Sequence, residues 1–350
     1  MADSGVVVAP EALARFCASA FQEMGVPSGD ASLVADTLIQ ADLRNVGTHG
    51  VSRLRGYVDR LKAGGMVAQP RMSVISDGGA TLLLDGGNGI GQVVAARAMG
   101  LVIERAKSHG IASVGVRNCN HVGALAYYPR MGLAENLICF AVSGSAPMMA
   151  PWGGLDKLLS TAPWSIAIPA GEELPIVVDF SCTSMNVLKA GTMAERGEEL
   201  PPGIALAADG QPTRDPAEAL KGVILPIGGH KGYGLMLALD VLSSLLTGAN
   251  YSTGIPRPNE LTRPQGIGLL MLALRIDRFM PVQEFKARVD DLIRKLKGSR
   301  RVPGVQKILI PGERSELLAR QRLMEGIPLP AGVVQSLRGV AQELSLPLPF

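Results

Sequence analysis

The chain has 350 residues, 47% of them hydrophobic and 19% charged, which is typical of a globular protein long enough for two closely packed domains. Its formal charge of +3 and aromatic content of 4% argue against a nucleic-acid-binding surface. No window approaches the ~18 apolar residues that span a membrane, and the start of the chain lacks the basic and apolar regions of a signal peptide. The four cysteines are scattered without CxxC pairs, so we expect a soluble, cytoplasmic protein with reduced thiols.

The first third of the chain carries the periodicity of helices. Apolar residues recur at helical spacing over Pro10–Met24 and Ser28–Leu43, and Ser28 with Asp30 offers an N-terminal cap for the second helix. A further helix is predicted after His49, with an apolar face formed by Val51, Leu54, Val58 and Leu61 and an opposite face formed by Arg53, Tyr57 and Arg60.

The middle of the chain changes to strand-like patterns. Residues Ser73–Leu84 alternate like a hairpin whose turn is Asp77-Gly78-Gly79. Residues Gly91–His109 form a clear helix, closed by Gly110. Between Ile111 and Asp179 four β-type runs then follow at short spacing: IASVGV, LICFAVS, WSIAIPA and IVVDFS.

The last third alternates again between helix and strand. A helix opening at about Lys231 is apolar nearly all round, which predicts burial. The strand Ile267–Ile276 precedes a charged amphipathic helix, Val282–Lys297, and the basic run Arg294–Arg301 is interpreted as its solvated end. A short helix ends the chain. The pattern as a whole predicts an α/β protein in which helices from both termini wrap a central sheet domain.

The segment ADLRNVGTHGVSRLRGYVDRL holds the strongest candidate for chemistry. It places His49 on a short loop between glycines, with Arg44 upstream and Arg53 downstream. Imidazole has the unperturbed pKa nearest neutrality, and arginine binds a carboxylate through paired hydrogen bonds. These residues suit a small anionic substrate that exchanges a proton, although a solvated helix face beside a loop histidine fits the same pattern.

The middle of the chain is rich in glycine, which is also common in nucleotide-binding loops. No GxGxxG occurs, and the nearest approach, Gly87–Gly91, lacks the third glycine, so a Rossmann fingerprint is not supported. No GxxxxGK[ST] occurs either. The run Gly228-Gly229-His230-Lys231-Gly232, however, opens a helix and suits an anion or a pyrophosphate. A flexible glycine turn into a core helix is the alternative.

Two polar residues follow strands. Asp179 ends the strand run IVVDFS and precedes Ser181 and Thr183, so its carboxylate accepts a ribose hydroxyl or caps the next turn. His121 follows the strand run IASVGV and enters a glycine-rich loop, where it is either a ligand contact or a structural histidine.

Metal and serine-nucleophile chemistry are not expected. The histidines at 49, 109, 121 and 230 show neither HxxxH nor HxH spacing, and His109 is most simply a last-turn helix residue. No GxSxG elbow is present.

Taken together, six segments resemble the type-2 malate/L-lactate dehydrogenase family, and the resemblance covers nearly the whole chain. This family also includes ureidoglycolate and sulfolactate dehydrogenases, diketogulonate reductase and a piperideine-2-carboxylate reductase. The segments are ADLRNVGTHGVSRL, VRNCNHVGALAYY, APWGG, VVDFSCTS, ILPIGGHKGYGL and PGER…GIPLP.

The resemblance implies a fold, a cofactor and a set of site residues. The fold would be a non-Rossmann NAD(P)-binding sheet domain over residues 121–284, with a helical part for substrate and dimerisation over residues 1–120 and 285–350. His49 would be the proton donor and acceptor, and the remaining substrate-site residues would be Thr48, Arg44, Arg53 and His121. The cofactor would be NAD or NADP, with NAD slightly favoured, held by Thr161, Val178, Asp179, Phe180, Ser181, Thr183, His230, Lys231, Gly312, Glu313 and Arg314.

The resemblance further implies an oxidoreductase that interconverts a small 2-hydroxy acid and its 2-oxo acid, usually as a homodimer. A reductase of a cyclic imino acid or diketo acid, and a non-catalytic nucleotide-binding protein, are the alternatives. Two departures from the family pattern stand out. Thr48 replaces the usual serine before the histidine, and Ser160-Thr161-Ala162-Pro163 replaces Gly-Thr-Asn-Pro, so that an anchoring amide is missing at Ala162.

Overall fold

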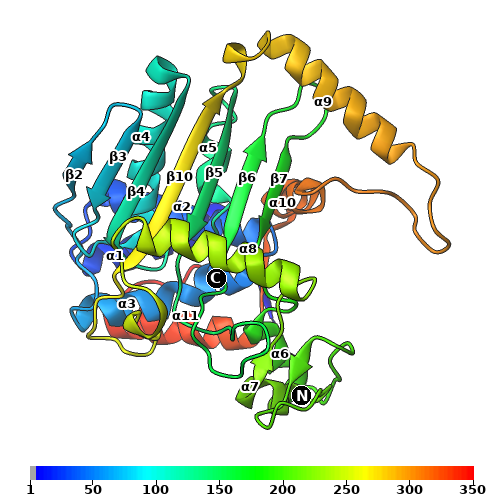
Figure 1. Cartoon of the computed structure of the whole chain (residues 1–350). Coiled ribbons are helices and arrows are strands. Elements are labelled where there is room, and N and C mark those ends of the chain that lie inside the picture. The colour runs from blue at the N-terminus through cyan, green and yellow to red at the C-terminus, as the bar shows by residue number, and fades with distance from the viewer. Residues whose placement is uncertain (1–4) are drawn as a thin grey trace.

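The computed structural model describes residues 5–350, and within them the central element is a seven-stranded sheet (Figure 1). Its order is β2-β3-β4-β10-β5-β6-β7, in which β3 and β4 run parallel and the other neighbouring pairs antiparallel. The strands are β2 (Ser73–Asp77), β3 (Thr81–Asp85), β4 (Ile111–Cys119), β5 (Leu137–Ser143), β6 (Trp164–Ile168), β7 (Ile176–Phe180) and β10 (Ile267–Arg275).

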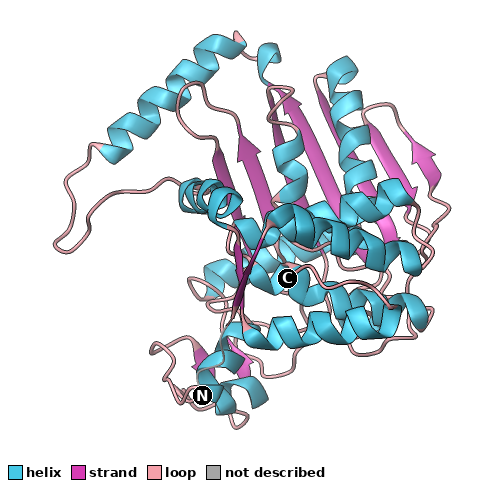
Figure 2. Ribbon diagram, turned by 180° about the vertical axis from the view of Figure 1, so that it is seen from behind, coloured by secondary structure: helices cyan, strands magenta, loops and turns pink. Residues whose placement is uncertain are grey.

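Helices cover the two faces of this sheet unequally. Helices α4 (Gly91–His109) and α5 (Tyr127–Met131) pack on one face, which Figure 2 shows from behind. The other face carries α8 (His230–Asp240), which continues as a π-helical turn, Val241–Leu245, and crosses in front of the strands in Figure 1. The side chains beneath α4 and α5 form the main core of the sheet, with Val114, Met271 and Ala273 fully buried.

A second layer combines the two ends of the chain. Strand β1 (Val6–Val8) pairs antiparallel with β11 (Ile327–Leu329), and one apolar core joins residues of both terminal regions. The helices of this layer are α1 (Pro10–Glu23), α2 (Ser28–Leu43), α3 (Leu54–Lys62), α10 (Glu313–Glu325) and α11 (Ala331–Leu344). The predicted border at residue 120 falls directly after β4, which lies inside the order of the sheet.

Two further parts extend from the sheet. A small lobe has a core of its own and is built from α6 (Val187–Glu195), β8 (Ala205–Leu206), α7 (Pro216–Lys221) and β9 (Val223–Ile224). Helix α9 (Val282–Lys297) leads into an extended stretch that returns to β7 at Pro311, whose carbonyl accepts the N–H of Val177 at 3.0 Å (Figure 1).

Many of the predicted elements are confirmed. The hairpin over Ser73–Leu84 is β2–β3, and Gly79 in its turn donates its N–H to Asp77. The helix Gly91–His109 has the predicted bounds and ends at Gly110, whose φ of +83° suits glycine. The predicted strands appear as β4 to β7 and β10, and the charged helix as α9.

Two predictions are wrong. Ser28 and Asp30 do not cap α2, because Pro27 occupies the cap position and Ser28 is already helical; the Asp30 carboxylate binds Arg97 instead. The helix opening at Lys231 is not buried all round, since Leu245 and Leu246 are 51% and 63% exposed. The sequence analysis also missed α10, β1 with its partner β11, and the small lobe. No helix within residues 5–350 is both long and apolar enough to cross a membrane.

Candidate active site

Two histidines from distant parts of the sequence stack at the junction of the helical layer and the sheet. His49 lies in the short 3₁₀ turn Gly47–His49 between α2 and α3, and His121 follows β4. Their ring centroids are 5.4 Å apart and their planes differ by 18°. The structure therefore brings together the two histidines that sequence analysis singled out.

A buried carboxylate holds the turn that carries His49. Asp42, 6% exposed, accepts the backbone N–H of Val51 at 2.8 Å. A Cβ on Gly50 would lie 2.0 Å from the Asp42 carboxylate, so only glycine fits there. Burial raises the pKa of Asp42 to about 6. This close packing explains why His49 needs a glycine directly after it.

The surroundings of His49 keep its ring neutral. Thr48 Oγ1 lies 3.0 Å from its Nδ1, and Arg53 Nε donates to the Thr48 carbonyl at 2.6 Å. Burial lowers the pKa of His49, and the nearby Arg53 charge lowers it further, to about 4. At neutral pH the free protein therefore presents an uncharged imidazole that can accept a proton, with a guanidinium beside it.

His121 is held in one tautomer. Its Nδ1 accepts the backbone N–H of Gly123 at 3.3 Å, so this nitrogen carries no proton, and the Tyr57 hydroxyl at 2.7 Å must donate to the same atom. Burial, followed by the charges of His49 and of Arg53, holds the pKa of His121 well below its usual value. The neutral ring thus carries its proton on Nε2 and can donate it in a hydrogen bond to a ligand.

Tyr57 is a site residue that sequence analysis placed on a helix face without a role. It is 4% exposed, and burial raises the pKa of its hydroxyl to about 12. Its position eight residues after His49, on the same face as Arg53, was the only signal. Arg60, on that face too, instead donates to the carbonyls of Arg263 and Gly65.

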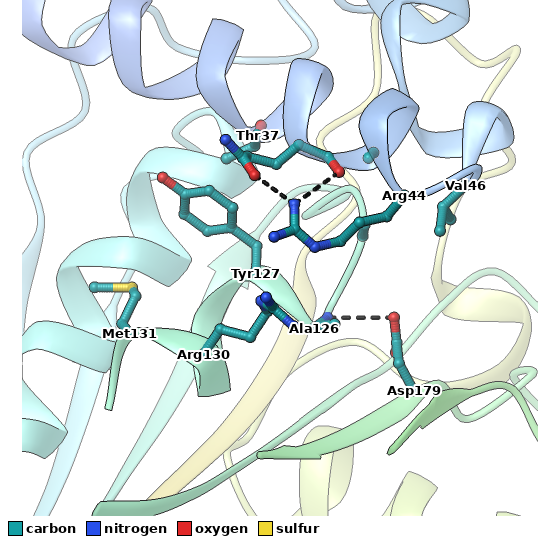
Figure 3. A pocket seen from close by; sticks show the side chains of 11 residues that line it. Thr37, Arg44, Val46, Ala126, Tyr127, Arg130, Met131 and Asp179 are labelled. Carbon is teal, nitrogen blue, oxygen red and sulfur yellow. Dashed lines mark hydrogen bonds between the residues drawn. The ribbon is translucent and has the colours of Figure 1, made fainter. Parts of the chain in front are cut away.

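Arg44 and Asp179 lie on the wall of a neighbouring cavity of about 250 Å³ (Figure 3). Arg44 donates to Gln40 and forms an ion pair with Glu316 at 3.2 Å. Asp179 accepts the Ala126 N–H at 3.3 Å and keeps an exposed carboxylate at the cavity wall, where partial loss of solvent raises its pKa above the usual value. Arg44 thus lies in this cavity, whereas Arg53 contacts the Thr48 carbonyl in the histidine turn.

The segments expected to hold a cofactor converge around the end of β7. The Cys182 N–H donates to the Thr161 carbonyl at 2.9 Å, and the Cys182 carbonyl accepts the Ile227 N–H at 3.0 Å, next to the start of α8. On the other side Gly312, with φ +90°, packs so closely on Val177 that a Cβ would lie 2.9 Å from the valine Cβ. These segments carry the residues expected to hold the cofactor: Thr161, Val178, Asp179, Phe180, Ser181, Thr183, His230, Lys231, Gly312, Glu313 and Arg314.

The start of α8 fits a phosphate-bearing cofactor. Gly228 and Gly229 have φ of +59° and +65°, and a Cβ on Gly229 would lie 3.1 Å from the Trp152 ring. The first N–H groups of a helix lack partners within the helix, and here the exposed Lys231 adds a positive charge beside them. These residues therefore suit the pyrophosphate of a dinucleotide.

The departure at Ala162 falls on an unusual backbone position. Ala162 is fully buried with φ +41°, a conformation that asparagine tolerates better than alanine. Its N–H donates to Ser160 Oγ at 3.0 Å. An asparagine at this position would relieve the backbone, so its absence removes a conformational advantage as well as an amide.

Residues 5–350 contain no group of three or more histidine, cysteine or acidic side chains placed to hold a metal ion.

The fold and the sequence of this chain match those of oxidoreductases of the dehydrogenase kind. The sequence profile of malate/L-lactate dehydrogenases matches residues 8–338, and the chain belongs to this family. It is 37% identical to a malate dehydrogenase of Pyrococcus abyssi, over 97% of this chain and 96% of the relative. Family membership implies a nicotinamide cofactor.

Solved structures agree with this assignment. The sulfolactate dehydrogenase of Methanocaldococcus jannaschii superposes with a TM-score of 0.93 and 35% identity, covering 97% of this chain and 98% of that one. The Δ1-piperideine-2-carboxylate reductase of Pseudomonas syringae has a TM-score of 0.85 and 26% identity, covering 96% of this chain and 100% of that one.

The tautomer of His121 can be tested through Tyr57. In Tyr57→Phe we expect kcat to fall by about 3- to 30-fold, because Nδ1 loses the stronger of its two donors and the other tautomer becomes populated. Imidazole ¹⁵N shifts should show an unprotonated Nδ1 in the wild type and a mixture in the variant. Tyr128→Phe is the control, since the Tyr128 hydroxyl is also buried but donates to the Val122 carbonyl. Identical His121 shifts in wild type and Tyr57→Phe would contradict the assignment.

Proposed function

We propose that the protein transfers a hydride from NAD(P)H to a small 2-oxo acid. In the reverse direction it transfers a hydride from the 2-hydroxy acid to the oxidised cofactor. The observation that carries this proposal is the stacked, neutral His49–His121 pair beside Arg53. Malate and sulfolactate, the substrates in the names of two similar proteins, are both 2-hydroxy acids with a second acidic group.

Each residue then has one task. Arg53 binds the C1 carboxylate through its guanidinium. His121 donates its Nε2–H to the substrate oxygen at C2 and so fixes the orientation of that carbon. His49 takes the hydroxyl proton during oxidation and returns it during reduction. Thr48 orients the His49 ring through Nδ1. The bound nicotinamide would supply or accept the hydride at C2.

The cofactor would lie along the end of β7, across a sheet domain that is not of the Rossmann type. Lys231 and the start of α8 would hold the pyrophosphate, and Asp179 a ribose hydroxyl. NAD is slightly favoured over NADP, because Asp179 presents a carboxylate where a ribose would bind. The helices within 1–120 and 285–350 would serve substrate binding, and the part over 121–284 would hold the cofactor and, through the outer face of α8, the dimer contact.

Removing the proton carrier tests the central role. His49→Asn keeps the shape of the site but cannot exchange a proton, so we expect kcat to fall by about 10²- to 10⁴-fold with cofactor affinity nearly intact. His109→Asn is the matched control, because His109 ends α4. A His49→Asn variant that reduces its best 2-oxo acid at close to the wild-type rate would rule out His49 as the acid and base.

The low pKa of His49 predicts an unusual pH profile. Reduction needs the protonated ring, and above a pKa of about 4 that fraction falls about tenfold per pH unit. We therefore expect log kcat/KM for reduction to fall with a slope of about −1 between pH 5 and pH 7, while kcat/KM for oxidation stays level. A level reduction profile from pH 5 to pH 6 would mean that the His49 pKa lies near its ordinary value.

Reduction of a cyclic imino acid is the alternative, favoured by the likeness to the piperideine-2-carboxylate reductase. It uses the same carboxylate contact, but the proton goes to a ring nitrogen. An NADH and NADPH oxidation screen with pyruvate, oxaloacetate, a diketo acid and piperideine-2-carboxylate separates these activities. If none of these compounds is consumed, the remaining alternative is a nucleotide-binding protein without catalytic activity.

The outer face of α8 and its π-helical turn supports the proposal of a homodimer. Leu245, Leu246 and Tyr251 are 51%, 63% and 58% exposed. Between residues 232 and 251 the one charged residue is Asp240, which is buried and accepts the Ser160 N–H. An apolar face without charge suits pairing with an identical copy.

Charge on this face should dissociate the dimer. We expect light scattering to show a dimer for the wild type and a monomer for Leu245→Lys, because a lysine there would be buried against its own counterpart. Leu323→Lys is the control, since Leu323 is 52% exposed on α10. A fully active monomeric wild type would refute the homodimer, and a dimeric Leu245→Lys would place the interface elsewhere.

A further inference from the structure

Two arginines on the wall of the cavity in Figure 3, Arg44 and Arg130, share one carboxylate, Glu316. Glu316 of α10 bridges Arg44, directly after α2, at 3.2 Å, and Arg130 of α5 in a closer contact. The side chains are 18%, 19% and 20% exposed for Arg44, Glu316 and Arg130. The two arginines also line the cavity.

This cluster carries one carboxylate for two guanidinium groups. Burial alone would raise the pKa of Glu316, but Arg130 and Arg44 together lower it, so the carboxylate is ionised. Burial lowers the pKa of Arg44, and the Arg130 charge lowers it further. The Arg44 Nε is buried and has no hydrogen-bond partner among residues 5–350. Asp36 lies near enough to raise the pKa of Arg44, and Asp179 lines the same cavity, so what the cluster leaves unmatched is the buried Nε donor of Arg44.

We infer that Arg44 and Arg130 form a receptor for a second acidic group of a bound ligand, and that Glu316 is the internal carboxylate which this group replaces. The inference rests on the proposed function. The cavity adjoins the histidine turn, because Val46 lines it and accepts the His49 N–H at 2.8 Å. Arginine pairs bind phosphate, carboxylate and sulfonate groups alike.

Two ligands can bring such a group. One is the ribose phosphate that distinguishes NADPH from NADH, since α10 begins at the expected cofactor segment, and here the two arginines would have to outweigh the Asp179 carboxylate in the same cavity. The other is the distal acid of a 2-oxo diacid.

Glu316 has an alternative ion-pair partner when a ligand acid displaces its carboxylate from the two arginines. Its Oε1 lies 3.9 Å from Nε of Arg320, one helical turn along α10, and Arg320 is 61% exposed. A rotation of the Glu316 side chain towards solvent would thus exchange one arginine partner for another. The incoming acid would keep the two cavity arginines neutralised.

Two substitutions with opposite expected effects test the receptor. Arg130→Met removes a cation while keeping the aliphatic length, and Glu316→Gln removes the competing charge while keeping the shape. Arg97→Met is the control, because Arg97 forms an exposed pair with Asp30. Dissociation constants for NADH and NADPH are measured by fluorescence titration. Those for oxaloacetate and pyruvate are measured by calorimetry with cofactor analogues bound, without turnover.

We expect Arg130→Met to weaken the ligand that carries the second acid by about 10- to 100-fold, and Glu316→Gln to tighten it several-fold. A changed dissociation constant for NADPH but not for NADH identifies the ribose phosphate as the bound group. A changed constant for oxaloacetate but not for pyruvate identifies the distal acid of the diacid. Either result supports the receptor.

Equal weakening of all four ligands by both variants would show that the cluster only supports the fold, and unchanged constants would show that no anion binds there. Both overturn the inference. Because these are equilibrium measurements, a protein that shows the expected shifts without turnover would refute the proposed function and leave the receptor standing.

Discussion

The candidate active site depends on the contact between the His49 and His121 rings. This contact lies where the helical layer meets the end of β4. His49 comes from the helices built by the two ends of the chain, and His121 from the sheet. Loss of solvent at this junction is the first cause of the low pKa of both rings. The packing of the two layers thus sets the protonation state of the two histidines.

The neutral state of these rings also divides their roles. The fixed tautomer of His121 makes it a hydrogen-bond donor that cannot accept a proton at Nδ1, where Tyr57 and Gly123 already donate. His49 has only Thr48 at its own Nδ1, a hydroxyl that can donate or accept. One imidazole is therefore restricted to orienting a ligand, whereas the other remains free to gain and lose a proton.

The sequence predicted those features that local patterns encode. The helix Gly91–His109 and the strand runs follow from periodicity and from glycine at a helix end, and His49 stood out through its neighbouring glycines and arginines. The exposed face of α8 could not be predicted, because hydrophobicity does not reveal which apolar face lacks a partner. Tyr57 and Glu316 were missed because their partners, His121 and Arg44, are 64 and 272 residues away.

Helix α10 connects these distant parts and had no clear signal in the sequence. At its start Gly312 packs against Val177 of β7, one turn on Glu316 binds Arg44, and near its end Arg322 contacts the Asp42 carbonyl and the Asn45 side chain. Asp42 in turn accepts the Val51 N–H behind His49. One helix thus spans from the segment expected to hold the cofactor to the turn that carries the proton-exchanging histidine. A ligand that displaces Glu316 would therefore bind against the same helix that contacts the turn carrying His49.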